Sequence, residues 1–211
     1  MELSEEGLQL IVDYEVGGGK AYYDKFCKNP TVPDPRHTQS GVTIGIGWDC
    51  GRHTPAELEN EWKKYLEEQE ISSLGKVCGL KGMKAYRALK SLGRIEIGWE
   101  AALNQFLTYT ISRYWQTTCK AFPGVEEAPQ PVREALLSLI FNRGRGMDGD
   151  RRVEMRAIRD LVASRSWSGI PAKIREMERL WPDTKGLLAR REAEAKFIEA
   201  GLRSEKEAFI A

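Results

Sequence analysis

Hydrophobic positions near the start of the chain recur at the spacing of an amphipathic helix. Leu8, Ile11 and Val12 are followed by Glu15, and positions three or four residues apart share one face of a helix. A serine suited to N-capping precedes this segment, with two acidic residues directly after it. Three glycines at 17–19 follow it, and glycine readily adopts the left-handed conformation that ends a helix. We therefore predict a first helix whose apolar face ends in a carboxylate.

Residues 42–49 show the alternation of a half-buried β-strand. The bulky set, which the pattern directs toward a core, is Val42, Ile44, Ile46 and Trp48. The other face carries Thr43, two glycines and Asp49. Glycines on an open strand face allow a ligand to approach the backbone closely. A second short strand is predicted at residues 21–23, after the glycine turn and directly before Asp24.

The rest of the chain is predicted to be mostly helical, beginning with Thr54 as an N-cap and Pro55 in the first turn. Helical periodicity recurs at residues 83–92, 99–118, 131–142, 151–164, 170–180 and 186–200. The almost wholly apolar run VREALLSLIFN predicts a central buried helix. We expect an α+β fold, mainly helical, with residues 1–211 in one domain. A small N-terminal lobe with a β-hairpin would span residues 1 to about 55, a larger helical lobe residues 56–211, and a ligand cleft would separate them.

Composition and charge narrow the class of protein. The chain is 41% hydrophobic and 30% charged, as in ordinary soluble globular proteins. Residues 1–130 carry 15 Lys and Arg against 18 Asp and Glu (−3), whereas residues 131–211 carry 17 against 13 (+4). This bias is too weak to indicate nucleic-acid binding, but it suits a polyanionic polymer such as a cell wall. The acidic start does not resemble a signal peptide, and no apolar run predicts a membrane span.

The cysteines and histidines offer little support for metal or nucleophilic chemistry. The cysteines are Cys27, Cys50, Cys78 and Cys119. They form no CxxC pair, which argues against a zinc or thioredoxin-type site. A Cys27–Cys50 disulfide that staples the segment between them is one possibility, and four reduced thiols are the other. His37 and His53, the only histidines, lie in turn-like segments, which disfavours a Ser-His-Asp or Cys-His mechanism.

Three residues of the N-terminal region suggest acid–base chemistry. Glu15 lies at the edge of an apolar helix face, where removal from water disfavours the charged carboxylate. A general acid at neutral pH needs such an environment. The glycine turn returns the chain to Asp24, and Thr43 lies on the open face of the next strand. We therefore predict that Glu15 at the helix end, Asp24 after the glycine turn and the hydroxyl of Thr43 converge on one site.

The spacing of these residues resembles the catalytic signature of the phage-type lysozymes, glycoside hydrolase family 24. Glu15 is followed nine residues later by Asp24, and then by Thr43 within the segment GVTIGIG. The run SLIFNRG at 138–144 is similar to the family's buried helix and the element that ends it. The run GLLARREAEAKFI at 186–198 is similar to its closing helix. The resemblance covers both ends of the chain in the expected order and implies a lysozyme-like fold.

The resemblance also implies roles for individual residues. Glu15 would protonate the glycosidic oxygen of the β-1,4 bond between N-acetylmuramic acid and N-acetylglucosamine in peptidoglycan. Asp24 would stabilise the transition state and place a water that Thr43 holds, with inversion and carboxyl groups about 6.5–9.5 Å apart. Phe141 and Asn142 would line the substrate cleft on the helical side. The resemblance implies neither a metal nor an organic cofactor.

Two features of the chain depart from the family pattern. A Pro-rich insertion separates Asp24 from Thr43, and residues 75–120 match no family element. Asp49, six residues after Thr43, and Asp34, within the insertion, therefore stay open as alternatives for the second carboxylate. Asp49 is also a candidate substrate-binding residue.

Other functions and settings stay open at this stage. A lytic transglycosylase, chitinase or chitosanase is possible on a related scaffold, and a catalytically silent wall-binding module is an alternative of another class. We expect a monomer made in the cytoplasm without a signal peptide, acting on peptidoglycan in the periplasm or outside the cell. Its partner would be a membrane-permeabilising protein for a phage endolysin, or an immunity protein for a secreted effector.

Overall fold

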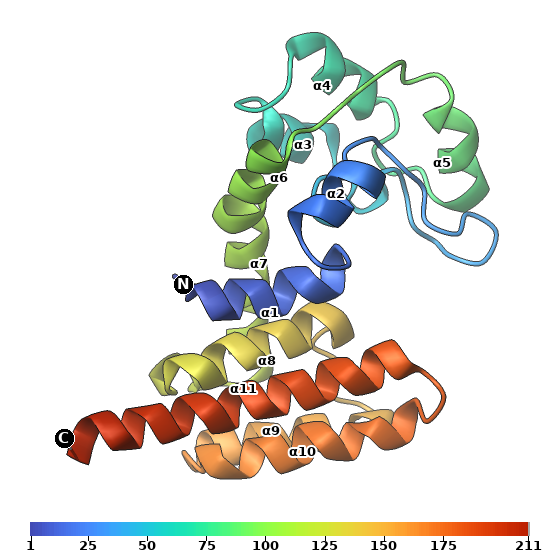
Figure 1. Ribbon diagram of the computed structural model, residues 1–211. Helices are drawn as coiled ribbons and strands as arrows, with labels where there is room; N and C mark the ends of the chain where they lie inside the picture. Colours follow the sequence, from blue (N-terminus) through green and yellow to red (C-terminus); the bar gives the residue numbers. More distant parts are fainter. Residues whose placement is uncertain (211) are drawn as a thin grey trace. The chain divides into compact units, whose positions relative to one another are not determined.

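The computed structural model describes residues 1–210 of the chain, and the side chains of residues 1–208. The described chain is mainly helical with one small antiparallel sheet, which confirms the mainly helical α+β class (Figure 1). It divides into two compact units. Unit 1 comprises Met1–Tyr14 and Ser112–Ala211, and unit 2 comprises Glu15–Ile111. The lobe boundary expected near residue 55 lies within unit 2, because residues 56–111 group with residues 15–55, whereas most of the first helix groups with the C-terminal helices.

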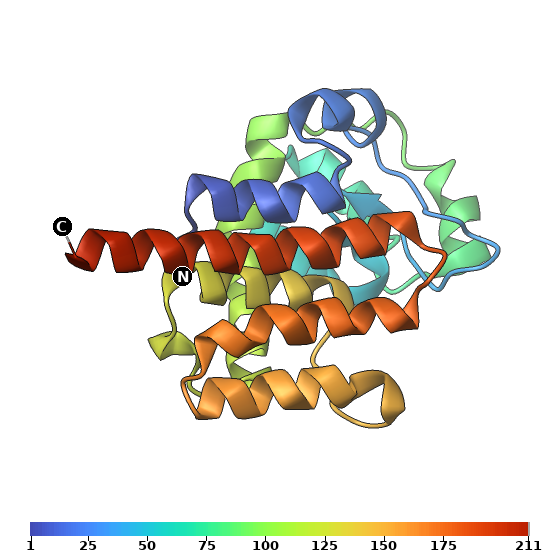
Figure 2. The ribbon, with the colours of Figure 1, turned by 60° about the horizontal axis from the view of Figure 1, so that its bottom comes forward.

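Unit 1 is built around two long helices that lie side by side. Its helices are α1 (Glu5–Glu15, within this unit through Tyr14), α7 (Ile111–Ala121), α8 (Gln130–Arg143), α9 (Val153–Ala163), α10 (Ile170–Glu176) and α11 (Lys185–Ile210). Helix α11 packs against α8 and α10, and α10 packs against α9 (Figure 2). Helix α8 buries Val132 and every residue of 134–140, which confirms the predicted central helix.

A buried carboxylate joins the first helix to the central one. Ser4 caps α1, since its hydroxyl oxygen accepts from the Gly7 amide at 2.9 Å. Glu134 of α8, only 1% exposed, accepts from the Ser4 amide at 2.6 Å and from its hydroxyl at 2.7 Å. The predicted cap is therefore confirmed. Its contact with Glu134 gives a tertiary reason for α1 to belong to unit 1.

The α10–α11 pair is also joined by charge. Arg175 of α10 donates from Nε to Glu192 and from Nη1 to Glu199, both at 2.6 Å. These two glutamates are seven residues apart and therefore lie on one face of α11. The hydrogen bonds from Arg175 lower the pKa of both carboxyl groups below their ordinary value.

Unit 2 combines short helices with the small sheet. Its helices are α2 (Lys20–Phe26), α3 (Pro55–Trp62), α4 (Glu68–Gly75), α5 (Gly82–Leu89) and α6 (Trp99–Gln105), and its strands are β1 (Thr43–Ile44) and β2 (Trp48–Asp49). Thr54 and Glu57 form a capping box at the start of α3, which confirms the predicted helix start. A π-helical turn at Phe106–Thr110 follows α6, and the helical backbone continues into α7.

Residues 42–49 form a hairpin rather than the single strand predicted from their alternation. Strand β1 pairs antiparallel with β2 in the register Thr43–Asp49 and Ile44–Trp48, so the chain reverses at residues 45–47. The four bulky residues are nevertheless all buried, as the pattern predicted. The reversal depends on Gly45 and Gly47, whose φ angles are +56° and +72°. Alternation correctly identified the buried side chains, but it did not reveal where the chain turns back.

The hairpin is held by contacts with α3 and with the chain beyond it. Trp48 is buried and donates from Nε1 to Glu61 at 2.8 Å, and Gln105 donates to the same carboxylate oxygen at 2.9 Å. The Trp48 ring also stacks on His53, with centroids 4.1 Å apart. The inward position predicted for Trp48 is therefore confirmed. These contacts fix the hairpin that carries Thr43 and Asp49.

Candidate active site

Glu15 occupies the position that the sequence predicted, at the end of the first helix. It is the last residue of α1 and is half-buried, and Val16 directly after it is fully buried. The three glycines at 17–19 that follow have φ angles of +57°, +109° and +85°, which confirms the sharp turn. Glu15 thus lies at the edge of the buried apolar residues of the first helix.

Asp24 lies in a different local structure from the one predicted. Residues 20–26 form helix α2, so the expected strand at 21–23 is wrong. Asp24 forms an ion pair with Lys20, one helical turn earlier, and its side chain is 45% exposed. This i, i+4 spacing of opposite charges is a helical signal that the strand interpretation overlooked.

A tertiary anchor fixes helix α2. The Tyr23 ring is buried against Trp99 with centroids 5.3 Å apart, and its hydroxyl donates to the Ile97 carbonyl at 3.0 Å. Helix α2 is held by one buried tyrosine, whereas Tyr22 and Phe26 on its other faces are exposed. Asp24 is therefore presented on a solvent-facing helix, beside a lysine that partly neutralises it.

Thr43 and Asp49 face each other across the hairpin. They are direct partners in the antiparallel register. The amide and carbonyl of Thr43 both bond to Thr31 on the other side, at 2.7 and 3.0 Å. Thr43 and Asp49 therefore form a non-hydrogen-bonded pair, the type in which opposed side chains approach most closely. The hairpin thus places a hydroxyl beside a carboxylate, which the single-strand interpretation attributed to two positions along one strand.

Asp49 also organises its own turn. Its Oδ1 accepts from the amides of Gly41 and Gly51, each at 2.8 Å, and Oδ2 lies 3.2 Å from Arg52 Nε. The side chain is 13% exposed, much less than that of Asp24. The Thr43 hydroxyl donates to the Gly41 carbonyl at 3.5 Å, so Gly41 contacts both side chains. Asp49 is consequently held in one position by backbone donors.

The glycine face expected to admit a ligand is not open at Gly45. A Cβ added there would lie 2.5 Å from Cη2 of Trp62, so the buried indole already occupies that space. At Gly47 no atom lies within 4 Å of the corresponding position. Close approach of a ligand to the backbone is therefore limited to the Gly47 side of the turn.

Asp34, the third alternative, lies in an exposed turn of the Pro-rich segment. Its φ angle is +35°, and its carboxylate lies 2.9 Å from Nδ1 of His37, three residues later. The carbonyl of Asp34 accepts from the amides of His37 and Thr38. This is the geometry of a local turn, and it accounts for the aspartate without a catalytic role.

Phe141 and Asn142 lie near the end of α8 in unit 1, whereas the acidic candidates belong to unit 2. Phe141 is half-buried and packs on Tyr114, with ring centroids 4.1 Å apart. Asn142 is exposed and lines a pocket of about 500 Å³. Asn142 is thus available for binding, and Phe141 has a packing role.

The two arginines of the closing helix are structural. Arg190 and Arg191 are both buried and pair with the fully buried Glu194, which also accepts from the Ser138 hydroxyl at 2.7 Å. Burial raises the pKa of Glu194, and the two guanidinium groups oppose that rise. This cluster joins α11 to α8, as expected of a motif that stabilises the fold.

The cysteines are all free, so the Cys27–Cys50 staple does not form. Cys50 is buried, and its interaction with the Cys78 thiol raises the pKa of Cys50 and lowers that of Cys78. Cys78 lies three residues after the end of α4, a position that spacing along the chain did not single out.

The described residues contain neither a cluster suited to a metal ion nor a helix suited to crossing a membrane. Among the described residues, no group of three or more His, Cys, Asp and Glu side chains is arranged to hold a metal ion. None of the described helices is both long and apolar enough to cross a membrane. Models of known protein families do not match this chain, and no curated protein sequence matches it.

Proposed function

We propose that the chain is a peptidoglycan hydrolase of the lysozyme type, with Glu15 as the general acid. The observation that carries this proposal is the combination of two features within unit 2. A half-buried glutamate ends the first helix at a glycine turn, and a hairpin pairs a threonine with a carboxylate. In the phage-type lysozyme signature the second carboxylate precedes the hydroxyl, as Asp24 precedes Thr43 here. The acid and the hydroxyl of the signature are thus both present in unit 2, and the hairpin adds Asp49 as a further carboxylate beside the hydroxyl.

For the second carboxylate we propose Asp49 in preference to Asp24. Asp49 is opposed to Thr43 in the hairpin register and is held by two backbone amides. Both aspartates have a cationic partner, Lys20 for Asp24 and Arg52 for Asp49, but the side chain of Asp24 is 45% exposed and that of Asp49 only 13%. A carboxylate that orients water needs a fixed position beside the group that shares that water. In this arrangement Thr43 and Asp49 would place the water, and Glu15 would protonate the departing sugar.

A turbidity assay on purified sacculi tests the proposal. Glu15→Gln should abolish clearing while leaving the unfolding transition cooperative, because the change removes the proton donor and little volume. Clearing by this variant at the original rate would remove Glu15 from the acid role. Binding of sacculi without clearing by the unmodified protein would instead indicate a wall-binding module.

A matched pair of amide variants distinguishes the two aspartates. Asp49→Asn keeps an oxygen that can accept from both amides, so it should preserve the turn and lower the rate of clearing by about 10²-fold or more. Asp24→Asn changes an exposed carboxylate and should have little effect. The reverse ranking would restore Asp24 to the catalytic role. If both variants keep full activity and the products end in anhydro-sugars by mass spectrometry, the enzyme is a lytic transglycosylase.

A further inference from the structure

A pocket of about 500 Å³ in unit 1 is lined mainly by cationic side chains. Arg143 comes from the last turn of α8, and Arg151 and Arg152 come from a 3-10 turn, η4 (Asp150–Arg152), before α9. Trp181, which precedes α11, forms part of the wall, and Asp148 is the only acidic residue among the lining residues. The lining residues lie up to 45 positions apart along the chain (187 − 142 = 45), and among them only Asn142 was predicted from the sequence to bind a ligand.

Stacking and backbone contacts hold the arginines. The Arg143 guanidinium lies over the Trp181 ring at 4.6 Å from its centroid, and that of Arg151 lies at 6.0 Å. Arg143 donates to the Arg151 carbonyl at 2.6 Å, and Arg152 donates to the Arg143 carbonyl at 2.8 Å. A stacked guanidinium has its plane fixed but keeps N–H groups at its edge for other acceptors. The guanidinium groups of Arg143 and Arg152 are therefore positioned by contacts within the chain.

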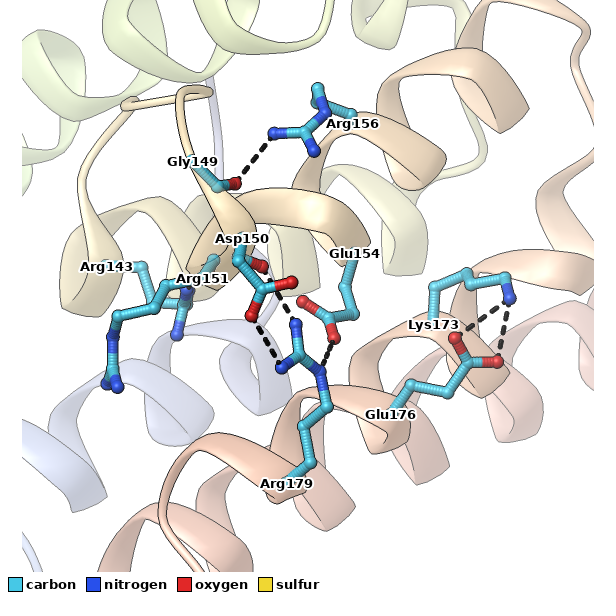
Figure 3. A network of polar contacts seen from close by, with 9 residues as sticks. All are labelled: Arg143, Gly149, Asp150, Arg151, Glu154, Arg156, Lys173, Glu176 and Arg179. Carbon is cyan, nitrogen blue, oxygen red and sulfur yellow. Dashed lines mark hydrogen bonds and ion pairs between the residues drawn. The ribbon is translucent and has the colours of Figure 1, made fainter.

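Two acidic residues near the pocket, Asp150 and Glu154, form ion pairs with Arg179. Figure 3 shows Arg179 joined to Asp150 and Glu154, whereas no dashed line joins Arg143 or Arg151 to a carboxylate. Within the part of the chain that the structure describes, none of the three pocket arginines forms an ion pair. Counting Asp148, the charged side chains of the pocket sum to +2 (3 − 1).

The buried nitrogens of this cluster show the same deficit of acceptors. Arg143 Nε and Arg152 Nη1 are shielded from solvent and have no hydrogen-bond partner among the described residues. Burial, and then the charge of Arg152, lower the pKa of Arg143 to about 10. The position of Arg143 in the last turn of a helix explains one favourable cation. It explains neither Arg151 nor Arg152, and an anion in the pocket would relieve the repulsion among the three guanidinium groups.

We propose that this pocket binds a phosphate dianion, either free or as a phosphate monoester. The charge of +2 matches a group that carries about −1.5 to −2 at pH 7, and guanidinium groups bind phosphate oxygens through paired N–H donors. The volume exceeds that of one phosphate and lies in the range of sites for small molecules, roughly 300–1,000 Å³. The proposal does not depend on glycan hydrolysis.

Calorimetric titration of the whole chain with inorganic phosphate at low ionic strength tests the site. Arg151→Gln should weaken binding about tenfold or more, since Arg151 is exposed and its side chain makes only the stacking contact. Arg145→Gln is the matched control, because Arg145 is an exposed arginine of the same loop that does not line the pocket. If both variants weaken phosphate binding equally, the loss of affinity follows from the net charge of the protein, and the proposed site is wrong.

A gain of affinity provides a test that misfolding cannot mimic. Asp148→Asn removes the acid of the pocket and should tighten phosphate binding about two- to fivefold. Unchanged or weaker binding would contradict the assignment, as would no binding of phosphate by the unmodified protein up to about 10 mM.

The source of the phosphate is resolved by parallel titrations with glucose 6-phosphate, glucose and succinate. Tighter binding of the sugar phosphate than of inorganic phosphate assigns a monoester, and equal or weaker binding assigns the free ion. Succinate that binds as tightly as phosphate would overturn the phosphate assignment in favour of carboxylates. Binding of neutral glucose with the same affinity as its phosphate would overturn the anion site altogether.

Discussion

The turn of the β-hairpin provides the sharpest test of the structure, through the substitution Gly45→Ala. Gly45 has a φ angle of +56°, and a Cβ there would lie 2.5 Å from Cη2 of Trp62, a contact that real Cβ atoms do not make. Trp62 is fully buried, so it has little room to yield. The new methyl group therefore meets two obstacles, one in the backbone and one in the packing.

The expected cost is the sum of these two effects. An L-residue in the left-handed region costs about 1–2 kcal/mol relative to glycine. Forcing a methyl group into a packed core costs about 1–3 kcal/mol more. Gly45→Ala should therefore lower the free energy of unfolding by about 2–5 kcal/mol. Gly47→Ala should lower it by only about 1–2 kcal/mol, because its φ is +72° but no atom lies within 4 Å of the added Cβ.

Urea unfolding of both variants measures the difference. Amide hydrogen exchange of residues 43–50 should accelerate more in Gly45→Ala than in Gly47→Ala, which localises the effect in the hairpin. If the two variants are equally stable, the indole does not fill the space beside Gly45, and the hairpin turn described here is wrong. The comparison is informative because both substitutions add the same group to the same turn.

Three further predictions concern the packing of helices and the thiols. Glu194→Gln should lower the stability of unit 1 by about 3–5 kcal/mol in urea unfolding, because it removes a buried negative charge that pairs with two buried guanidinium groups; an unchanged midpoint would contradict this role. Arg175→Gln should lose stability above the ordinary carboxyl pKa, where its two glutamate partners are charged, and should match the unmodified chain once acid protonates them; a deficit that is constant in thermal unfolding across pH would exclude this linkage. Diamide should join Cys50 to Cys78 with loss of two hydrogens; peptide mapping should find this cross-link absent in Cys78→Ser, and a Cys27–Cys50 peptide in its place would disprove the pairing.

Local sequence signals determined much of the helical architecture. Ser4 and Thr54 cap the helices that their positions predicted, and the apolar run at 132–142 is buried in α8. Helix caps and helix faces depend on residues within one or two turns of each other, so they can be read from the sequence directly. The end of the first helix at Glu15 was predicted for the same reason.

Long-range contacts decided what local patterns left ambiguous. Residues 20–26 have aromatic residues typical of a strand, yet the contact of Tyr23 with Ile97 and Trp99 is made from a helix. The alternation at 42–49 correctly predicted which side chains are buried, but it did not predict that the chain reverses within this segment. Trp62, 17 residues after Gly45 (62 − 45 = 17), fills the space on one side of the turn. Short segments carry too little periodicity to choose between such structures, and their partners make the choice.

The candidate sites divide in the same way. The sequence by itself determined that Glu15 ends an amphipathic helix, that Asp24 follows it nine residues later, and that Thr43 comes after a Pro-rich insertion. Only the tertiary structure opposed Thr43 to Asp49 and gathered three arginines, Asp148 and Trp181 around one pocket. The physical reason is that a side chain's charge is encoded locally, whereas its neighbours depend on how the whole chain folds.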